Sequence, residues 1–378
     1  MSLKRTPLYA AHQKLGGKLV EFGGWEMPVQ YSSIMEEHLA VRNAAGIFDI
    51  SHMGEIFVSG AAATEFLNLL LTNDASKLSP GQGQYTLMCN ERGGVIDDLY
   101  LYCLGLGNYM LIVNASRIEA DYEWIQRQHE KFPKTRSVFI SNNSDSYGAV
   151  AVQGPETPRF IESCFPTPSS GALGLSSLKK NEIATIPYEG EFIYVARTGY
   201  TGETGFEIVA PAHLIEKIWW TCLEQGERYG IKPAGLGSRD TLRTEMGYPL
   251  YGHELNEETT PIEAGLGYFV AFSKESFNGR PRMMQQKEQG PEKKLAAFKM
   301  KDKSPPPRPE YGIYQAGEDK MIGSVASGTQ SPSLNVGIGL GYLPASMAKP
   351  GVGLEIEIRG RKFPATVTSK PFYTKKNQ

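Results

Sequence analysis

The sequence predicts an α+β protein with mainly antiparallel strands, followed by a C-terminal part built from strands alone. Over the first two thirds of the 378 residues, short strand-like runs and amphipathic helices alternate irregularly. A doubly wound parallel sheet would alternate them regularly, so antiparallel pairing is favoured. After residue 294 the helical patterns disappear, and Gly and Pro recur at short intervals. Roughly the last 90 residues are therefore expected to form a small antiparallel barrel or sandwich.

Capping boxes of the S-x-x-E type mark the starts of two helices. One box is formed by Ser33 and Glu36, and the other by Ser116 and Glu119. In such a box the serine side chain accepts a hydrogen bond from a backbone N–H of the first helical turn. Further helices are expected over residues 61–71 and 213–229, the latter ending at Gly230, and a short one follows Asp240.

Short apolar runs with alternating polarity predict the strands. The clearest is 354–359, where Leu354, Ile356 and Ile358 alternate with charged residues, as in a half-buried strand. The others are expected over residues 54–59, 98–104, 109–114, 149–153 and 191–197. From Phe277 to Lys294 the composition shifts to Gly, Pro, Lys and Gln, which predicts a linker.

Composition and charge exclude several classes of protein. The 39 basic and 41 acidic side chains give a formal net charge of −2, which leaves no basic surface for nucleic acid. No apolar run approaches the ~18 residues of a membrane span, and no apolar segment of a signal peptide follows the N-terminus. The four cysteines lie far apart without metal-ligand spacing. We therefore expect reduced thiols, no metal site and a cytoplasmic protein.

The segment Gly93–Tyr102, with the sequence GGVIDDLYLY, joins a tight glycine turn to a strand that carries two carboxylates. Neighbouring side chains on a strand face opposite ways. One face therefore carries Asp97 with two leucines, and the other carries Asp98 with Tyr100 and Tyr102. The second face suits a flat heteroaromatic ligand. The alternative is that both aspartates only start the strand by hydrogen-bonding the turn.

Glycines recur every three residues in Arg197–Glu207, with the sequence RTGYTGETGFE. The run lacks the Lys-Ser/Thr of a phosphate loop and the G-x-G-x-x-G pattern, so it indicates a tight loop between strands. Glu207, at the start of a strand, could accept two hydrogen bonds from an aminopyrimidine edge. The alternative is a solvated turn glutamate.

Arg239 lies between the glycine-rich segment 235–238 and Asp240. The spacing leaves open whether it forms an ion pair with Asp240 or is a planar donor for a ligand. The segment His52-Met53-Gly54 could form a site loop, but a single histidine is more often a structural residue with its hydrogen bonds satisfied. The sequence supports no Ser-His-Asp set and no Schiff-base lysine.

Seven segments, in this order, resemble the T-protein of the glycine cleavage system, an aminomethyltransferase family. They are RTPLY (5–9), FGGWEMPVQY (22–31), VRNAAGIFDISHMGE (41–55), GGVIDDLYLY (93–102), RTGYTGETGFEI (197–208), GLGSRDTLR (235–243) and SKPFY (369–373). The resemblance implies a three-domain, cloverleaf-like α+β fold with a folate channel and a C-terminal antiparallel β-barrel. The implied boundaries are a folate-binding region at 1–275, divided into 1–55 plus 145–275 and 56–144, and a barrel domain at 285–378.

The resemblance also implies a reaction. T-proteins take the aminomethyl group carried on the dihydrolipoyl arm of the H-protein, release ammonia, and pass the methylene to tetrahydrofolate to give 5,10-methylenetetrahydrofolate. The lipoylated H-protein is therefore the expected partner, and tetrahydrofolate the expected co-substrate. No covalently bound cofactor is implied, and the chain is expected to be a monomer.

The site residues carried over from the family are expectations of the same kind. The catalytic aspartate corresponds to Asp98, which is expected to hydrogen-bond nitrogen-10 of the folate. The pterin-binding glutamate corresponds to Glu207, and the family's arginine to Arg239. Further folate contacts correspond to Met53, Tyr85, Tyr100, Asn114, Tyr200 and Tyr373.

Other members of the superfamily offer rival functions. Folate-binding modules fused to sarcosine- or dimethylglycine-oxidising flavoenzymes carry a dinucleotide-binding half, which we do not expect here. Non-catalytic folate binders that assist iron–sulfur cluster assembly carry a cysteine late in the chain, whereas no cysteine follows Cys222. This favours the transferase over the non-catalytic binder. A pure interaction protein is disfavoured by the joint presence of Asp98, Glu207 and Arg239.

Overall fold

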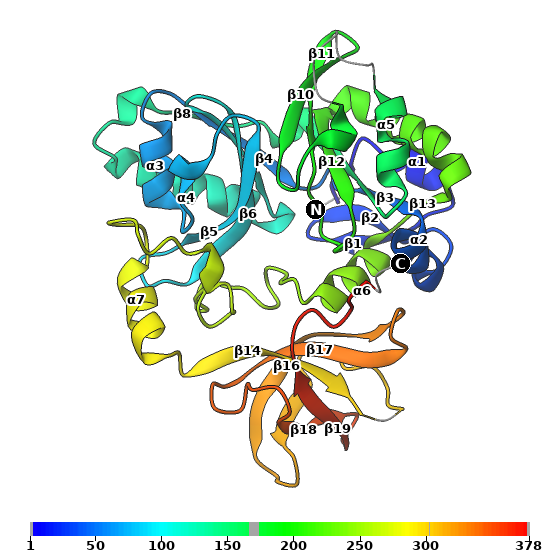
Figure 1. Ribbon diagram of the computed structural model, residues 1–378, viewed down its shortest axis with the longest axis vertical. Helices are drawn as coiled ribbons and strands as arrows, with labels where there is room; N and C mark the ends of the chain where they lie inside the picture. The colour runs from blue at the N-terminus through cyan, green and yellow to red at the C-terminus, as the bar shows by residue number, and fades with distance from the viewer. Residues whose placement is uncertain (1–2, 166–173, 302, 376–378) are drawn as a thin grey trace. The chain divides into compact units, whose positions relative to one another are not determined.

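The structure is a computed structural model that describes residues 3–165, 174–301 and 303–375 (Figure 1). The described chain forms two compact units. The first comprises the chain up to Thr86 together with Leu99–Arg239, and the second comprises Leu87–Asp98 together with the chain from Asp240 onward. Helices and sheets are mixed and the C-terminal strands close into a barrel, which confirms the predicted fold class. The domain boundaries given above stay a prediction.

A six-stranded sheet in the first unit has the order β10-β11-β12-β9-β3-β13. Its strands are β3 (Ala45–Asp49), β9 (Tyr147–Gln153), β10 (Ile183–Tyr188), β11 (Glu191–Ala196), β12 (Gly205–Pro211) and β13 (Ile231–Pro233). All neighbours pair antiparallel except β13, which runs parallel to β3. Helix α5 (Ala212–Gly226) packs on β3, β9 and β12 and buries Ile215 and Trp219 in the core. A single 3-10 turn follows α5, and Gly230 (φ 75°) ends it as predicted.

A second sheet has the order β5-β6-β7-β4-β8. Its strands are β4 (Gly54–Ser59), β5 (Gln82–Cys89), β6 (Val95–Gly105), β7 (Asn108–Val113) and β8 (Phe139–Asn142). Helices α3 (Ala63–Leu70) and α4 (Ile118–Lys131) contact each other beside it (Figure 1). On β6 the side chains alternate as predicted, because Asp97 is fully buried whereas Asp98 and Tyr100 are partly exposed.

The two predicted capping boxes differ in the structure. The remaining N-terminal elements are α1 (Tyr9–Lys14), β1 (Lys18–Phe22), β2 (Trp25–Gln30) and α2 (Ile34–Asn43). At the start of α2, the Ser33 hydroxyl accepts a hydrogen bond from the Glu36 N–H at 3.2 Å, as predicted. The prediction for Ser116 is wrong, because α4 begins at Ile118 and no side chain caps it. Ser116 lies inside a 3-10 turn, where it lacks the extended backbone of an N-cap residue.

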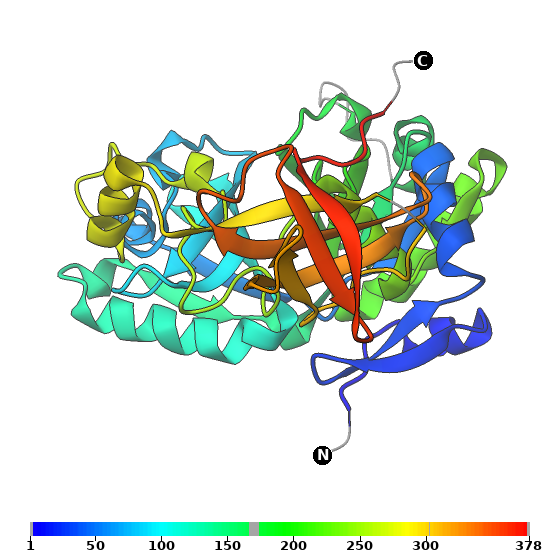
Figure 2. The same ribbon diagram turned by 90° about the horizontal axis from the view of Figure 1, so that it is seen from below.

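The second unit contains a closed barrel with the strand order β14-β17-β16-β15-β18-β19, which Figure 2 shows from below. Its strands are β14 (Lys293–Met300), β15 (Gly312–Gln315), β16 (Met321–Ser331), β17 (Val336–Pro344), β18 (Gly353–Ile358) and β19 (Arg361–Thr368). Phe298, Leu354 and Ile356 are among its buried core residues. Closure leaves no exposed strand edge. Helix α6 (Leu236–Met246) links the two units along the chain.

The prediction of a linker at 277–294 is wrong for most of this segment. Residues Arg280–Gln289 form a helix, α7. Gly279 precedes the helix with φ 77°, and Gly290 follows it with φ 81°. Pro281 lies in the first turn, where a missing N–H costs nothing. The breaker residues that indicated a linker are therefore the start and stop signals of a short helix.

Three further observations concern the described residues only. None of their helices combines the length and apolarity that crossing a membrane requires. No three of their His, Cys, Asp and Glu side chains gather as a metal site would need. All four cysteines are buried and free, and Cys164 hydrogen-bonds Cys222, which raises the pKa of the Cys222 thiol. The separation of these two cysteines in the sequence therefore conceals a close pair.

Candidate functional site

A row of tyrosine rings lines part of strands β5 and β6. The ring centroids of Tyr85 and Tyr100 are 6.0 Å apart, and those of Tyr100 and Tyr102 are 5.6 Å apart with an interplanar angle of 20°. Tyr100 and Tyr102 are two residues apart on β6, so they share a face of the strand with Asp98. The strand thus presents a carboxylate and flat phenol rings side by side.

A chain of hydroxyl groups connects this row to Glu207. The hydroxyl oxygens of Tyr102 and Thr198 are 2.9 Å apart, and the Thr198 hydroxyl donates to Glu207 Oε2 at 2.6 Å. Because each hydroxyl has one proton, Tyr102 donates to Thr198 and Thr198 donates to Glu207. Burial raises the pKa of Tyr102, which keeps that proton in place.

Glu207 is the third residue of β12 and is only partly exposed, so the expected strand-start position is correct. Its Oε2 is taken by Thr198, whereas Oε1 accepts no hydrogen bond from any residue that the structure describes. A half-satisfied carboxylate can still accept donors from a ligand. This differs from the environment of a fully solvated turn glutamate.

Arg239 lies against Tyr200, with the guanidinium carbon 4.8 Å from the ring centroid. Asp240 forms its ion pair with Arg243 at 2.7 Å. Within the described chain, Nη1 of Arg239 is buried and has no hydrogen-bond partner. Burial lowers the pKa of Arg239, and the nearby negative charge of Glu207 opposes that shift. A buried donor without an acceptor is costly, so this nitrogen indicates a missing ligand atom.

Met53 and Asn114 lie at the same end of the pair formed by strands β4 and β7. The register of β4 and β7 pairs Gly54 with Val113, so Met53 comes just before this last pair on one strand and Asn114 just after it on the other. The sequence pattern alone could not have placed these two residues at one end of a strand pair, because the pairing is non-local.

His52, next to Met53, is buried, and its ring is nearly perpendicular to that of Phe22, at an interplanar angle of 86° and a centroid distance of 5.7 Å. Burial lowers the pKa of His52 to about 4, and the positive charge of Arg239 adds to this shift. The ring is therefore neutral near pH 7. Asp49 stabilises the turn that precedes His52, because its Oδ1 accepts a hydrogen bond from the Ser51 N–H at 2.8 Å.

Tyr373 belongs to the second unit. Its backbone N–H donates to the carbonyl oxygen of Glu245 at 3.2 Å, and its side chain is partly exposed. This contact anchors the residues after the barrel to helix α6. The proposed folate contact of Tyr373 stays a prediction.

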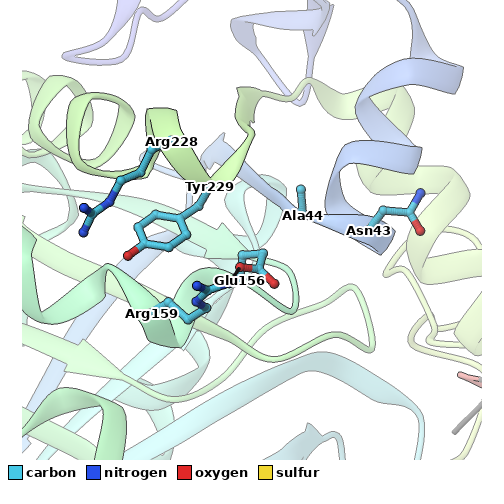
Figure 3. Close-up of a pocket in the computed structure, with 6 residues that line it drawn as sticks. All are labelled: Asn43, Ala44, Glu156, Arg159, Arg228 and Tyr229. Atoms are coloured by element: carbon cyan, nitrogen blue, oxygen red, sulfur yellow. Dashed lines mark hydrogen bonds and ion pairs between the residues drawn. The ribbon is translucent and has the colours of Figure 1, made fainter. Parts of the chain in front are cut away.

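A surface cleft of about 550 Å³ lies elsewhere on the first unit (Figure 3). The guanidinium carbons of Arg159 and Arg228 lie 5.0 Å and 4.8 Å from the ring centroid of Tyr229. The cleft is lined by Asn43, Ala44, Glu156, Arg159, Arg228 and Tyr229. None of these is a predicted site residue, so the candidate site is the cluster around Glu207 and Arg239.

Sequence reasoning missed Thr198 as a site residue. Thr198 joins Tyr102 to Glu207, two residues that belong to different sheets. The available signal was its place one residue before Gly199, in the loop singled out for its glycines.

The family model described as the GCVT N-terminal domain matches residues 8–274. The family model described as the glycine cleavage T-protein C-terminal barrel domain matches residues 293–374. The chain belongs to the glycine cleavage T-protein family. Its predicted resemblance to T-proteins is therefore confirmed over almost its whole length.

Relatives of this T-protein match it end to end. A protein from Halothermothrix orenii named "Aminomethyltransferase" is 44% identical over 370 residues, covering 98% of this chain and 100% of the relative. One of the same name from Lysinibacillus sphaericus is 46% identical, covering 98% of each chain. The crystal structure of the glycine cleavage system aminomethyltransferase T from Bartonella henselae has a TM-score of 0.89 at 33% identity, covering 98% of both chains. The T-protein fold is thus shared throughout.

Proposed function

We propose that this T-protein is a tetrahydrofolate-dependent aminomethyltransferase of the glycine cleavage system. It takes the aminomethyl group from the dihydrolipoyl arm of the H-protein and passes the methylene to tetrahydrofolate, giving 5,10-methylenetetrahydrofolate. In the balanced reaction, the two N–H protons of tetrahydrofolate end on the released ammonia and on the lipoyl thiol. The full-length similarity to proteins named "Aminomethyltransferase" supports this proposal.

The observation that carries the proposal is the pair of unused polar atoms at Glu207 and Arg239. Oε1 of Glu207 is an open acceptor, and Nη1 of Arg239 is a buried donor without an acceptor. The pterin ring of a folate has an amino group and a ring N–H on one edge and a carbonyl oxygen beside them. Such a ring supplies donors for Glu207 and an acceptor for Arg239, so the residues present fit a folate.

Aromatic side chains add to this fit. The rings of Tyr85 and Tyr100, and the ring of Tyr200 on which Arg239 lies, offer flat surfaces for a heterocycle. These residues were also expected from the family resemblance. Together they would orient the folate and fix the position of its reacting nitrogen, and positioning supplies much of the rate in such a transfer.

Asp98 is the residue we assign to the chemical step. It shares a strand face with Tyr100 and is partly exposed. A carboxylate there can hydrogen-bond nitrogen-10 of the folate and take part in moving its proton. As an anion it would also stabilise the positive charge that develops when ammonia leaves.

The deciding experiment measures ammonia release from aminomethylated H-protein by the purified chain, with and without tetrahydrofolate. We expect rapid release that depends on folate, with 5,10-methylenetetrahydrofolate as product. A chain that binds folate by titration but gives no stimulated release would instead be a non-catalytic folate binder. A chain that neither binds folate nor releases ammonia would contradict both functions.

We also propose that the protein works in the cytoplasm as a monomer. The four free, buried cysteines fit a reducing compartment, where thiols stay unpaired. Light scattering coupled to gel filtration checks the oligomeric state, for which we expect the 41.6 kDa of a single chain.

A further inference from the structure

The loop between β11 and β12 carries Tyr200 and is anchored at several points by side chains from outside it. Its ends are Ala196 and Gly205, and Gly202 within it has φ 83°. A loop of this composition has few intrinsic constraints, since glycine is the most conformationally free residue. Its shape must therefore come from the groups that bind it.

Arg42, in the last turn of α2, is the first of these groups. Its Nη1 donates to the carbonyl oxygen of Thr201 at 2.7 Å and to Glu203 Oε1 at 3.0 Å. The Arg42 and Glu203 side chains are only 2% and 3% exposed. One guanidinium thus holds the loop on both sides of Gly202, and one of its contacts is to the backbone next to Tyr200.

Gln153, the last residue of β9, is the second group. Its Nε2 donates to the carbonyl oxygen of Thr198 at 3.1 Å, and its Oε1 accepts the Thr201 hydroxyl at 2.8 Å. A Cβ added at Gly199 would lie 1.9 Å from Oε1 of Gln153. The loop therefore packs closely around the Gln153 amide. The amide binds Thr198 and Thr201, the two residues on either side of Gly199 and Tyr200.

We propose that Arg42 is a positioning residue for folate binding, which acts by holding the backbone next to Tyr200 so that its ring stays against Arg239. This inference rests on the proposed function. A buried ion pair is a weak source of stability, because desolvation offsets most of its attraction. Its two-point geometry, by contrast, fixes the loop in a way that an apolar pair of similar volume would not.

The test compares Arg42→Lys with Arg159→Lys. Lysine keeps the charge, but a flexible ammonium replaces the rigid, planar guanidinium that aims Nη1 at both the Thr201 carbonyl and Glu203. Arg159 pairs with Glu156 at 2.6 Å with a 65% exposed side chain, so the same exchange there is a matched control (Figure 3). Two readouts are measured on the full chain: hydrogen exchange of the amides in 198–205, and tetrahydrofolate affinity by titration calorimetry.

For Arg42→Lys we expect about tenfold faster exchange in 198–205 and about tenfold weaker folate binding. The KM for folate should rise while kcat at saturating folate stays close to that of the wild type. Arg159→Lys should change neither quantity. If Arg42→Lys fails to fold, Glu203→Gln replaces it, because that variant removes the charge that holds Arg42 in place. For Glu203→Gln we expect smaller changes in the same direction, and unchanged exchange and folate affinity would overturn the inference.

A double-mutant cycle with Tyr200→Ala identifies the route of the effect. If Arg42 acts through the Tyr200 ring, Arg42→Lys should cost little further affinity once that ring is gone. An equal loss in both backgrounds would overturn the inference, and so would a lower melting temperature with unchanged folate affinity. If the wild-type chain binds no folate, the proposed function fails as well, and the wild-type titration reveals this separately from the exchange data.

Discussion

At the scale of single residues, Glu207 ends a chain of hydroxyl groups that begins at the buried Tyr102. Thr198 occupies one carboxylate oxygen and so restricts the rotation of the group, which leaves the other oxygen available to the folate that we propose. The arrangement orients an acceptor without satisfying it. Such preorganisation reduces the ordering cost of binding.

We predict that Glu207→Gln weakens tetrahydrofolate binding by about 1–3 kcal/mol. The glutamine amide replaces one acceptor with a donor, which then faces the N–H groups of the pterin edge. Titration calorimetry measures the change, and Glu65→Gln, at an exposed ion pair with Lys134, is the control. Unchanged affinity in Glu207→Gln would remove the residue from the site.

For Asp98→Asn we expect at least a roughly hundredfold loss of folate-dependent ammonia release, with folate affinity retained. Asparagine keeps the shape of the side chain and loses the charge and the basic oxygen. Asp319→Asn, at an exposed position on the barrel, is the control. Near-normal turnover in Asp98→Asn would contradict its catalytic role.

Single residues were predictable from the sequence where the reason is local. The alternation rule placed Asp98 and Tyr100 on one face of β6, and the structure confirms that face. The link from Tyr102 to Thr198 was not predictable, because the two residues are 96 apart in the chain. The buried nitrogen of Arg239 was not predictable either, because its surroundings depend on the tertiary fold.

At the scale of elements, the same four-residue pattern has two outcomes. Ser33 caps α2, whereas Ser116 lies in a 3-10 turn before α4 and caps nothing. The pattern names the residue types of a capping box but not the backbone conformation that the cap residue must adopt. That conformation depends on how the preceding strand ends.

We predict that Ser33→Ala lowers the free energy of unfolding by about 1 kcal/mol, because a backbone N–H of α2 loses its acceptor. Urea denaturation followed by circular dichroism measures the loss. Ser116→Ala is the matched control and should leave stability unchanged within error. Equal effects at the two serines would contradict the capping assignment.

At Ser116 a cap was predicted that does not form, whereas helix α7 formed in a segment where no helix was predicted. Its residues between Gly279 and Gly290 include Met, Gln, Lys and Glu, which favour helices. The flanking glycines and Pro281 dominated the prediction because they are the strongest local breakers. Their position relative to the helix, rather than their number, carries the information.

At the scale of the whole molecule, the fold class was predictable and the pairing of strands was not. Alternating polarity in 354–359 correctly predicted a strand of the C-terminal β-unit, now seen as β18 of a closed barrel. The parallel pairing of β13 with β3 joins residues 231–233 to 45–47. No local pattern encodes a contact over that separation, so only the folded chain reveals it.

The dependence of global stability on pH follows from buried groups whose pKa values shift on folding. His52 has a pKa of about 4 in the folded protein against an ordinary value of 6.5. Between these values the unfolded chain binds the proton and the folded chain does not. The contribution of His52 is therefore fully present above pH 6.5 and is lost as the pH falls towards 4.

Glu55 acts in the opposite direction. Burial raises the pKa of this carboxyl, and neither of its oxygens has a hydrogen-bond partner in the described chain. The folded protein therefore holds a proton that the unfolded chain releases above pH 4.5, so this contribution decreases as the pH rises. The contributions of His52 and Glu55 to the pH dependence of stability therefore partly cancel in the wild type. Comparing the wild type with a variant that lacks one of the two groups separates them.

We predict that His52→Asn changes the slope of stability against pH. The free energy of unfolding of the wild type minus that of the variant should increase by up to about 3 kcal/mol between pH 4 and pH 6.5. Urea titrations at several pH values measure this difference. His213→Asn, at an exposed position on α5, is the control and should give a flat difference. A flat difference for His52→Asn as well would mean that the His52 ring is protonated equally in the folded and unfolded chains, and that its burial does not limit stability in acid.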